Sequence, residues 1–140
     1  MRNEPKLQYD FTGKTIVVAD DLRINFVLFN AIMEGTNARL IWAKSGNEAV
    51  EICLNQDFID LVLMDLEMPG MNGIEATREI KKIRKEIPIV AQTAFEAYFN
   101  EEEILHAGCS QIITKPLMPE YLLSTIAQYL RNNTKISKTG

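Results

Sequence analysis

The sequence predicts a single α/β domain built on a parallel sheet with helices on both faces. Between Lys14 and about Asn132, five short runs rich in β-branched and apolar residues alternate with five helical patterns. Strands that alternate with helices indicate βαβ units, and near-continuous apolar strands indicate burial on both faces. At 140 residues, the chain has room for one such domain with one folded core.

The five predicted strands are short and end at polar residues. They are expected at residues 15–19, 39–43, 61–64, 89–91 and 111–114. The first, third and fourth strands are almost entirely apolar, which is typical of the buried middle of a parallel sheet.

A helical pattern follows each strand, and capping signals mark several of the ends. The helices are expected at about residues 23–34, 46–55, 73–85, 101–107 and 119–132. Ser45 with Glu48 predicts a capping box, and Asn100 with Glu103 predicts a similar pairing. Gly108 is the expected C-terminal cap of the fourth helix, and Pro119 suits the first turn of the fifth.

Residues 1–13 are expected to be a leader or linker, residues 14–131 the domain, and residues 132–140 a flexible tail.

Composition limits the partners and the location of the chain. The net charge of −4 argues against a nucleic-acid surface and mildly against an anionic membrane. No apolar run approaches the roughly 20 residues of a membrane-spanning helix. We therefore expect a cytoplasmic domain, with Cys53 and Cys109 as buried thiols.

Residues suited to phosphoryl transfer follow four of the predicted strands. Asp20 and Asp21 follow the first strand, Asp65 the third, Thr93 the fourth and Lys115 the fifth. The carboxyl ends of parallel strands share one edge of the sheet, so these side chains are expected to converge. A single acid after a strand is often only a helix cap, but the full set predicts a functional site.

The chemistry of this site follows from its charge. Clustered carboxylates repel one another unless a divalent cation neutralises them, and hard oxygen ligands suit Mg²⁺. Asp65 is the expected nucleophile, which would form an aspartyl phosphate. The metal and Lys115 would offset the charge on the transferred group, and Thr93 would donate a hydrogen bond to it. Because the chain has no ATP-binding motif, the phosphoryl donor is expected to be a small molecule or another protein.

These motifs resemble the receiver domain of two-component response regulators. The resemblance extends from about Lys14 to Leu130, and the motifs that carry it are Asp20-Asp21, Leu63-Met64-Asp65-Leu66-Glu67-Met68-Pro69, Asn72-Gly73, Thr93-Ala94 and Lys115-Pro116. It implies a flavodoxin-like (CheY-like) doubly wound sheet of five strands in the order 2-1-3-4-5, with five helices.

The resemblance also implies roles for individual residues. Asp65 would take a phosphoryl group from a phosphohistidine. Asp21, Asp65 and the backbone carbonyl of Glu67 would hold Mg²⁺ directly, and Asp20 would hold it through water. The peptide bond before Pro116 is usually cis in this family.

Within the family, the sequence is most similar to receivers attached to hybrid sensor histidine kinases. The similarity lies in residues 60–65, 73–78 and 88–94. A histidine kinase or a histidine phosphotransfer domain is therefore the expected partner. The parent protein would then be a hybrid kinase, and the domain would lie at the cytoplasmic end of a membrane-bound sensor. Whether the chain stands alone, and whether phosphorylation drives a homodimer, stays open.

Four further residues are assigned to switching or partner contact. Ile112 lies where the family usually carries a switch aromatic, so it acts in the switch or is simply core. Phe95 is expected either to shield the phosphoryl group or only to pack its loop. The first helix is apolar nearly all the way round, so Phe26 and Phe29 face a partner or the fifth helix.

An alternative reading is a phosphatase of the haloacid dehalogenase type. That class also uses an aspartyl phosphate, a hydroxyl, a lysine and Mg²⁺. Its nucleophile typically follows an early strand, with a second aspartate two residues later, whereas here Asp65 follows the third strand and Glu67 takes the second position. The receiver reading is preferred, in which the isolated domain is no enzyme beyond catalysing its own phosphorylation and dephosphorylation.

Overall fold

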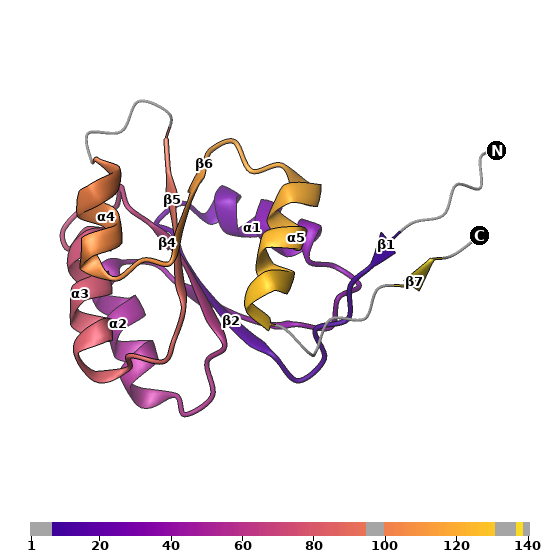
Figure 1. Ribbon diagram of the computed structural model, residues 1–140, viewed down its shortest axis with the longest axis horizontal. Coiled ribbons are helices and arrows are strands. Elements are labelled where there is room, and N and C mark those ends of the chain that lie inside the picture. The colour runs from indigo at the N-terminus through magenta and orange to yellow at the C-terminus, as the bar shows by residue number, and fades with distance from the viewer. Residues whose placement is uncertain (1–6, 95–99, 131–136, 139–140) are drawn as a thin grey trace.

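A five-stranded parallel sheet forms the centre of the molecule, with helices packed on both of its faces (Figure 1). The computed structural model describes residues 7–94, 100–130 and 137–138. The strand order is β3-β2-β4-β5-β6, which is 2-1-3-4-5 when only these five strands are counted. Helices α1 and α5 cover one face, and α2, α3 and α4 cover the other. The predicted fold class is confirmed.

The strands are β2 (Thr15–Ala19), β3 (Arg39–Ala43), β4 (Leu61–Asp65), β5 (Ile89–Thr93) and β6 (Gln111–Thr114). Every residue of β2, β4 and β5 is buried, which explains their apolar composition. Strands β4 and β5 extend one and two residues beyond their predicted ends, so Asp65 and Thr93 are the last residues of their strands. In the register, Asp65 pairs with Gln92 and Thr93 pairs with Thr114.

The helices are α1 (Arg23–Ile32), α2 (Gly46–Asn55), α3 (Gly73–Ile83), α4 (Glu101–Ala107) and α5 (Pro119–Leu130). Helices α1 and α3 end two residues earlier than predicted. At the end of α3, the guanidinium of Arg84 donates to the carbonyl oxygens of Cys53, Gln56 and Asp57. The Arg84 backbone leaves the helical region, with φ −111° and ψ 70°. This tertiary contact, which the sequence pattern does not reveal, accompanies the early end of the helix.

Capping interactions fix the start of three helices, but only partly as predicted. At α4, the Asn100 side chain accepts from the backbone N–H of Glu103 at 2.7 Å, as expected. The Ser45 side chain accepts from the backbone N–H of Glu48, as expected, whereas the Glu48 carboxylate accepts from Lys44 instead of Ser45. The predicted box at Ser45 is therefore only half formed. A complete capping box joins Asn72 and Glu75 at the start of α3.

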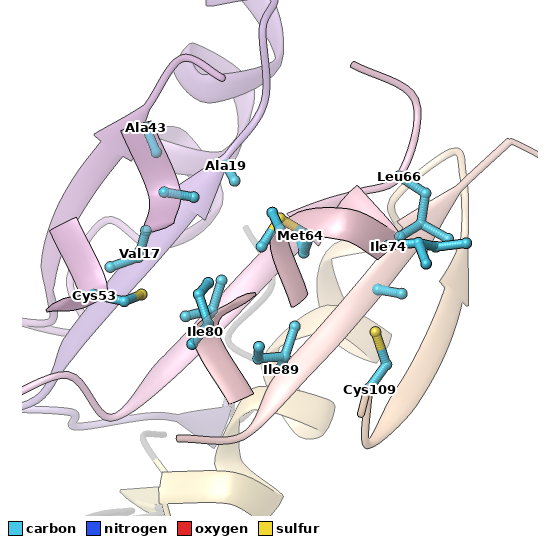
Figure 2. Close-up of a cluster of buried hydrophobic side chains, with 14 of the residues drawn as sticks. Val17, Ala19, Ala43, Cys53, Met64, Leu66, Ile74, Ile80, Ile89 and Cys109 are labelled. Atoms are coloured by element: carbon cyan, nitrogen blue, oxygen red, sulfur yellow. The ribbon is translucent and has the colours of Figure 1, made fainter. Parts of the chain in front are cut away.

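The core consists of two clusters, one on each face of the sheet, because successive strand residues point in opposite directions. Figure 2 shows the cluster under α2, α3 and α4, in which Val17 and Met64 from the strands meet Ile80 from α3. The opposite cluster joins Ile16 and Leu63 to Phe29 of α1 and to α5. Cys53 and Cys109 are both free and buried in the structure.

Segments outside the predicted domain also take part in the structure. Phe11, which lies in the predicted leader, is completely buried in the cluster under α1 and α5. Its ring lies 5.8 Å from that of Tyr9. Two short strands, β1 (Leu7–Gln8) and β7 (Ser137–Lys138), pair antiparallel, a contact that the sequence pattern does not predict. Within the described residues, no helix has the length and apolar character needed to cross a bilayer.

Candidate functional site

The acids that were predicted to converge lie together at the carboxyl edge of the sheet. Asp20 and Asp21 directly follow β2, and Asp65 is the last residue of β4. One carboxylate oxygen from each of the three lies within 4.8 Å of the others. Asp20 and Asp65 are each 2% exposed, while Asp21 is half-buried. The strand order therefore places three negative charges in a small and largely buried volume.

Asp65 is held by a positive charge on one side and a backbone N–H on the other. The Lys115 ammonium donates to Asp65 Oδ2 at 3.1 Å, and the backbone N–H of Glu67 donates to Oδ1 at 2.9 Å. Burial raises the pKa of Asp65 above its ordinary value; the Glu67 N–H and Lys115 pull that pKa down, and nearby Asp20 adds to the rise. The carboxylate is thus oriented by charged and polar contacts that also favour its ionised form.

Asp20 is fixed by the first turn of α1. Its Oδ1 accepts from the backbone N–H of Leu22 at 2.9 Å, and the amide of Asn25 donates to Oδ1 and Oδ2 at 3.2 and 3.1 Å. The Lys115 ammonium lies 3.9 Å from Asp20 Oδ2. Sequence reasoning missed Asn25, although its position in the first turn after the acid pair was a signal that could have identified it.

Gly73 allows α3 to approach the loop that follows Asp65. A Cβ atom at this position would lie 2.4 Å from the carbonyl oxygen of Asp65 and 2.8 Å from Cα of Leu66. The backbone N–H of Gly73 donates to the carbonyl of Leu66 at 3.3 Å. The local structure therefore explains the Asn72-Gly73 pair: Asn72 caps α3, and Gly73 lets the helix approach the loop after Asp65.

A backbone hydrogen bond between neighbouring strand ends brings Thr93 and Lys115 together. The backbone N–H of Lys115 donates to the carbonyl of Thr93 at 2.9 Å, which keeps the end of β6 beside the end of β5. The Thr93 hydroxyl is 3.4 Å from the carbonyl oxygen of Ala94. The Lys115–Pro116 peptide bond is cis. Phe95 lies outside the described residues.

The residues of this edge fit a magnesium ion. Three carboxylates face one ammonium group, so negative charge is left over, and their oxygens are hard ligands close to one another. Mg²⁺ takes such ligands while keeping some of its water. The carboxylate set is the one that the sequence predicts, and Glu67, whose carbonyl was predicted as a further ligand, lies exposed in the adjoining loop.

The predicted switch and partner residues have different environments. Ile112 is half-buried against the cluster under α2, α3 and α4. Phe26 is half-buried and stacks on Trp42, with ring centroids 5.2 Å apart. Phe29 is only 1% exposed and belongs to the core. Of the two predicted alternatives for Phe29, burial towards the fifth helix is the one observed, because its position on α1 points it into the core.

Other side chains of α1 and its cap are exposed instead of Phe29. The largest apolar ones are Leu22, Ile24, Val27 and Leu28, with exposed fractions of 53%, 69%, 48% and 50%. The apolar excess of this helix is therefore divided between the core and the surface next to the acids.

A parallel sheet of this order, with an acid cluster and a lysine at its carboxyl edge, is the architecture of a receiver-type signalling domain. The family model of the response regulator receiver domain matches residues 16–127, and the chain belongs to that family. Among characterised relatives, the polar-differentiation response regulator DivK of Brucella ovis is 33% identical over 119 residues, which cover 84% of this chain and 96% of DivK.

Solved structures agree with this assignment. The receiver domain of the sensor histidine kinase PA1611 from Pseudomonas aeruginosa, solved with magnesium coordinated in its active-site cleft, shares 27% identity with a TM-score of 0.77, covering 85% of this chain and 98% of that one. A receiver domain protein from Methanospirillum hungatei shares 27% identity with a TM-score of 0.78, covering 84% and 93%.

A third structure shows a receiver domain with a partner. It contains the histidine phosphotransfer protein Ypd1 and the receiver domain of Ssk1 from Saccharomyces cerevisiae. The match has 26% identity and a TM-score of 0.76, and it covers 91% of the present chain and 91% of the matched chain. The chain is thus a receiver domain of two-component signalling, and the haloacid dehalogenase alternative is not supported.

Proposed function

We propose that Asp65 is the phosphoacceptor of a histidine-to-aspartate phosphorelay and that its reaction requires Mg²⁺. The observation that carries this proposal is the placement of Asp65, which is buried beside Asp20 and Asp21 with the Lys115 ammonium 3.1 Å from its Oδ2. The receiver family and the magnesium-bound Pseudomonas receiver support it.

In the proposed reaction, a carboxylate oxygen of Asp65 attacks the phosphorus of a phosphohistidine. A new P–O bond forms and the P–N bond breaks, and the released imidazole nitrogen takes a proton from water. Lys115 neutralises charge on the transferred phosphoryl oxygens, and the Thr93 hydroxyl donates a hydrogen bond to the new phosphoryl group.

The magnesium ion would be held by Asp21, Asp65 and the Glu67 carbonyl, with Asp20 acting through water. When bound, it supplies positive charge that offsets the repulsion between the carboxylates and the incoming phosphoryl oxygens. The chain's own contribution is to orient Asp65 through the Glu67 N–H and Lys115, and to orient Asp20 through Asn25.

The proposed phosphoryl donor is a histidine kinase or a histidine phosphotransfer domain. Exposed apolar side chains on α1, including Ile24, Val27 and Leu28, lie beside the acid cluster and suit an apolar helical partner. The Ypd1–Ssk1 structure supports a partner of this kind. Phe26, which is half-buried, is proposed as a support for this surface.

The proposed output is a shift between two states of the face formed by α4, β6 and α5. Ile112 takes the position of the usual switch aromatic, and the cis peptide at Pro116 belongs to the loop that presents Lys115. We also propose a cytoplasmic location. Homodimerisation on phosphorylation, and membership of a hybrid kinase, are further proposals for which the sequence resemblance is the support.

The deciding experiment is intact-protein mass spectrometry after incubation with acetyl phosphate and Mg²⁺. Wild-type protein should gain one phosphoryl group, and neither Asp65→Asn nor wild type with excess chelator should gain any. A repeat with a phosphorylated histidine phosphotransfer protein covers the case of a strict protein donor. Folded wild-type protein that gains no phosphate from either donor would contradict the proposal.

A further inference from the structure

Trp42 contacts the loop that carries Asp20 and Asp21, although it belongs to none of the motifs that define the site. It lies in β3, the strand next to β2, and it is the only tryptophan in the chain. Its indole Nε1 donates a hydrogen bond to the backbone carbonyl of Asp20 at 2.8 Å. That carbonyl belongs to the peptide bond between Asp20 and Asp21, so Trp42 holds the link between the two acids.

The end of β3 holds the acid pair by a second bond as well. The backbone N–H of Asp20 donates to the carbonyl of Ala43 at 3.0 Å. The peptides before and after Asp20 are therefore both tied to β3, the first through the main chain and the second through the indole. Without the indole bond, the second peptide would lose its tie to the neighbouring strand.

The direction of the indole is itself fixed by packing. The ring of Phe26 stacks on Trp42, with centroids 5.2 Å apart and planes 8° from parallel, and the Lys44 ammonium lies 5.1 Å from the ring centroid. Stacking and cation–π contacts restrict the rotation of the side chain. Its N–H is therefore already aimed at the Asp20 carbonyl.

Asp20 and Asp21 depend to different degrees on the hydrogen bond from Trp42. The Asp20 carboxylate is held by Leu22 and Asn25. Within the part of the chain that the structure describes, no hydrogen bond holds the carboxylate of Asp21. The direction of the Asp21 side chain thus depends on its backbone, and the Asp20 carbonyl is the adjoining point at which that backbone is anchored.

We propose that Trp42 is a positioning residue for metal binding. Its N–H fixes the peptide plane between Asp20 and Asp21, so that the Asp21 carboxylate stays beside Asp65 before the cation arrives. The inference rests on the proposed function of this site. Some residues hydrogen-bond to a metal ligand without contacting the ion itself. Removing such a residue commonly lowers the metal affinity.

The test compares Mg²⁺ affinity in wild type, in Trp42→Phe, and in a protein with benzothienylalanine at position 42, which replaces only the N–H by sulfur. Titration of backbone amide NMR shifts with Mg²⁺ gives each dissociation constant. Both changes should weaken binding about tenfold. At saturating Mg²⁺, phosphorylation by acetyl phosphate should return to within about twofold of wild type, because the defect lies in metal binding.

Tyr129→Phe is the matched control. It removes an aromatic hydrogen-bond donor, since the Tyr129 hydroxyl donates to Gln111 at 2.8 Å between α5 and β6. Its Mg²⁺ affinity should equal that of wild type. The benzothienylalanine protein keeps the shape of the indole, so it decides the question even if Trp42→Phe folds poorly.

The outcomes separate this inference from the proposal on which it rests. Wild-type protein that binds no Mg²⁺ would overturn the metal site and the inference with it. Wild-type protein that binds Mg²⁺ and forms the Asp65 adduct, with unchanged affinity in both altered proteins, would overturn the role of Trp42 alone. Equal weakening in the Tyr129→Phe control would likewise show that lost stability, and not lost positioning, is being measured.

Discussion

Gly73 shows how a single residue shapes the site without any reactive group. Alanine is normally favoured over glycine in a helix. At position 73, however, the new methyl group would lie 2.4 Å from the carbonyl oxygen of Asp65. The backbone of the acid loop or of α3 would have to move, so the usual preference is reversed here.

We therefore predict that Gly73→Ala lowers the free energy of unfolding by about 1–3 kcal/mol, the usual cost of overpacking. It should also slow phosphorylation by acetyl phosphate, because Asp65 would be displaced. Gly70→Ala is the control, since no atom lies within 4 Å of its added Cβ and only its φ of +76° is unfavourable. That variant should lose about 1–2 kcal/mol in urea unfolding and keep its phosphorylation rate.

Cys53 makes stability depend on pH at the alkaline end. Burial raises the pKa of its thiol from 9.0 to about 11, with Arg84 acting weakly in the opposite direction. Between these two values the unfolded thiol has lost its proton while the folded thiol keeps it. Ionisation then favours the unfolded chain, so stability present below pH 9 is lost as the pH rises toward 11.

The predicted result is a free energy of unfolding that falls with pH in this window, by up to about 1.4 kcal/mol per pH unit from this group. Urea unfolding of wild type and Cys53→Ala at several pH values measures it. Other groups titrate equally in both proteins, so the difference in slope belongs to Cys53. Parallel slopes would show that the thiol does not contribute.

The sequence predicted the convergence of the site residues because each one lies at the end of a strand or directly after it. Asp20, Asp21, Asp65 and Lys115 meet as strand order requires. Supporting residues were harder to find: Trp42 lies in a different strand from the acids it contacts, and only the folded sheet brings them together. For Phe29 the sequence left a partner and the fifth helix as alternatives, because a helix that is apolar nearly all round does not reveal which side is buried.

Helix α1 presents apolar side chains both to the core and to the surface. Ile24 is 69% exposed on this helix, and Ile83, at the end of α3, is 66% exposed. The two residues are identical in type and nearly equal in exposure but lie on opposite faces of the sheet. They provide a matched pair for testing whether α1 contacts the phosphoryl donor.

We predict that Ile24→Ser slows phosphotransfer from a histidine phosphotransfer protein about fivefold, which corresponds to a loss of about 1 kcal/mol of contact. Phosphorylation by acetyl phosphate should be unchanged, because the small donor needs no docking surface. Ile83→Ser should leave both rates unchanged. Equal slowing of both donors by Ile24→Ser would argue against docking through α1.

Arg84 links the end of α3 to the end of α2 and to the loop that follows it. Removing it would leave the carbonyls of Cys53, Gln56 and Asp57 without this donor. Arg84→Ala is predicted to lower the free energy of unfolding by about 1–3 kcal/mol. Lys82→Ala breaks only the exposed 3.0 Å pair with Glu79, so it should cost less than about 1 kcal/mol. Chemical denaturation of the two variants should separate them.

Element types were predictable where periodicity is strong, and element ends were not. The five strands and five helices lie where the pattern places them, but α3 ends early beside the tertiary contacts of Arg84. The pairing of β1 with β7 depends on residues more than a hundred positions apart, which no local pattern reports. The burial of Phe11 likewise depends on distant residues, since its cluster includes Leu122, Ile126 and Leu130 of α5.

For the whole molecule, the acid cluster links metal binding to folding. Unfolding separates the three carboxylates, so Mg²⁺ should bind the folded chain far better than the unfolded one. At a free Mg²⁺ concentration ten times the dissociation constant, the free energy of unfolding should rise by about 1.4 kcal/mol. Thermal unfolding with MgCl₂, compared with KCl at equal ionic strength, measures this, and an equal effect of both salts would contradict specific binding.

The strand order also determines when the site can come into existence. Its acids lie in the first half of the chain, but Lys115 follows β6, which among the described strands is an edge strand paired with β5. A chain still being synthesised can therefore carry all three acids and yet lack the ammonium that faces them. In the proposed reaction, Lys115 offsets the charge of the phosphoryl group, so the site as proposed is complete only once β6 has joined the sheet.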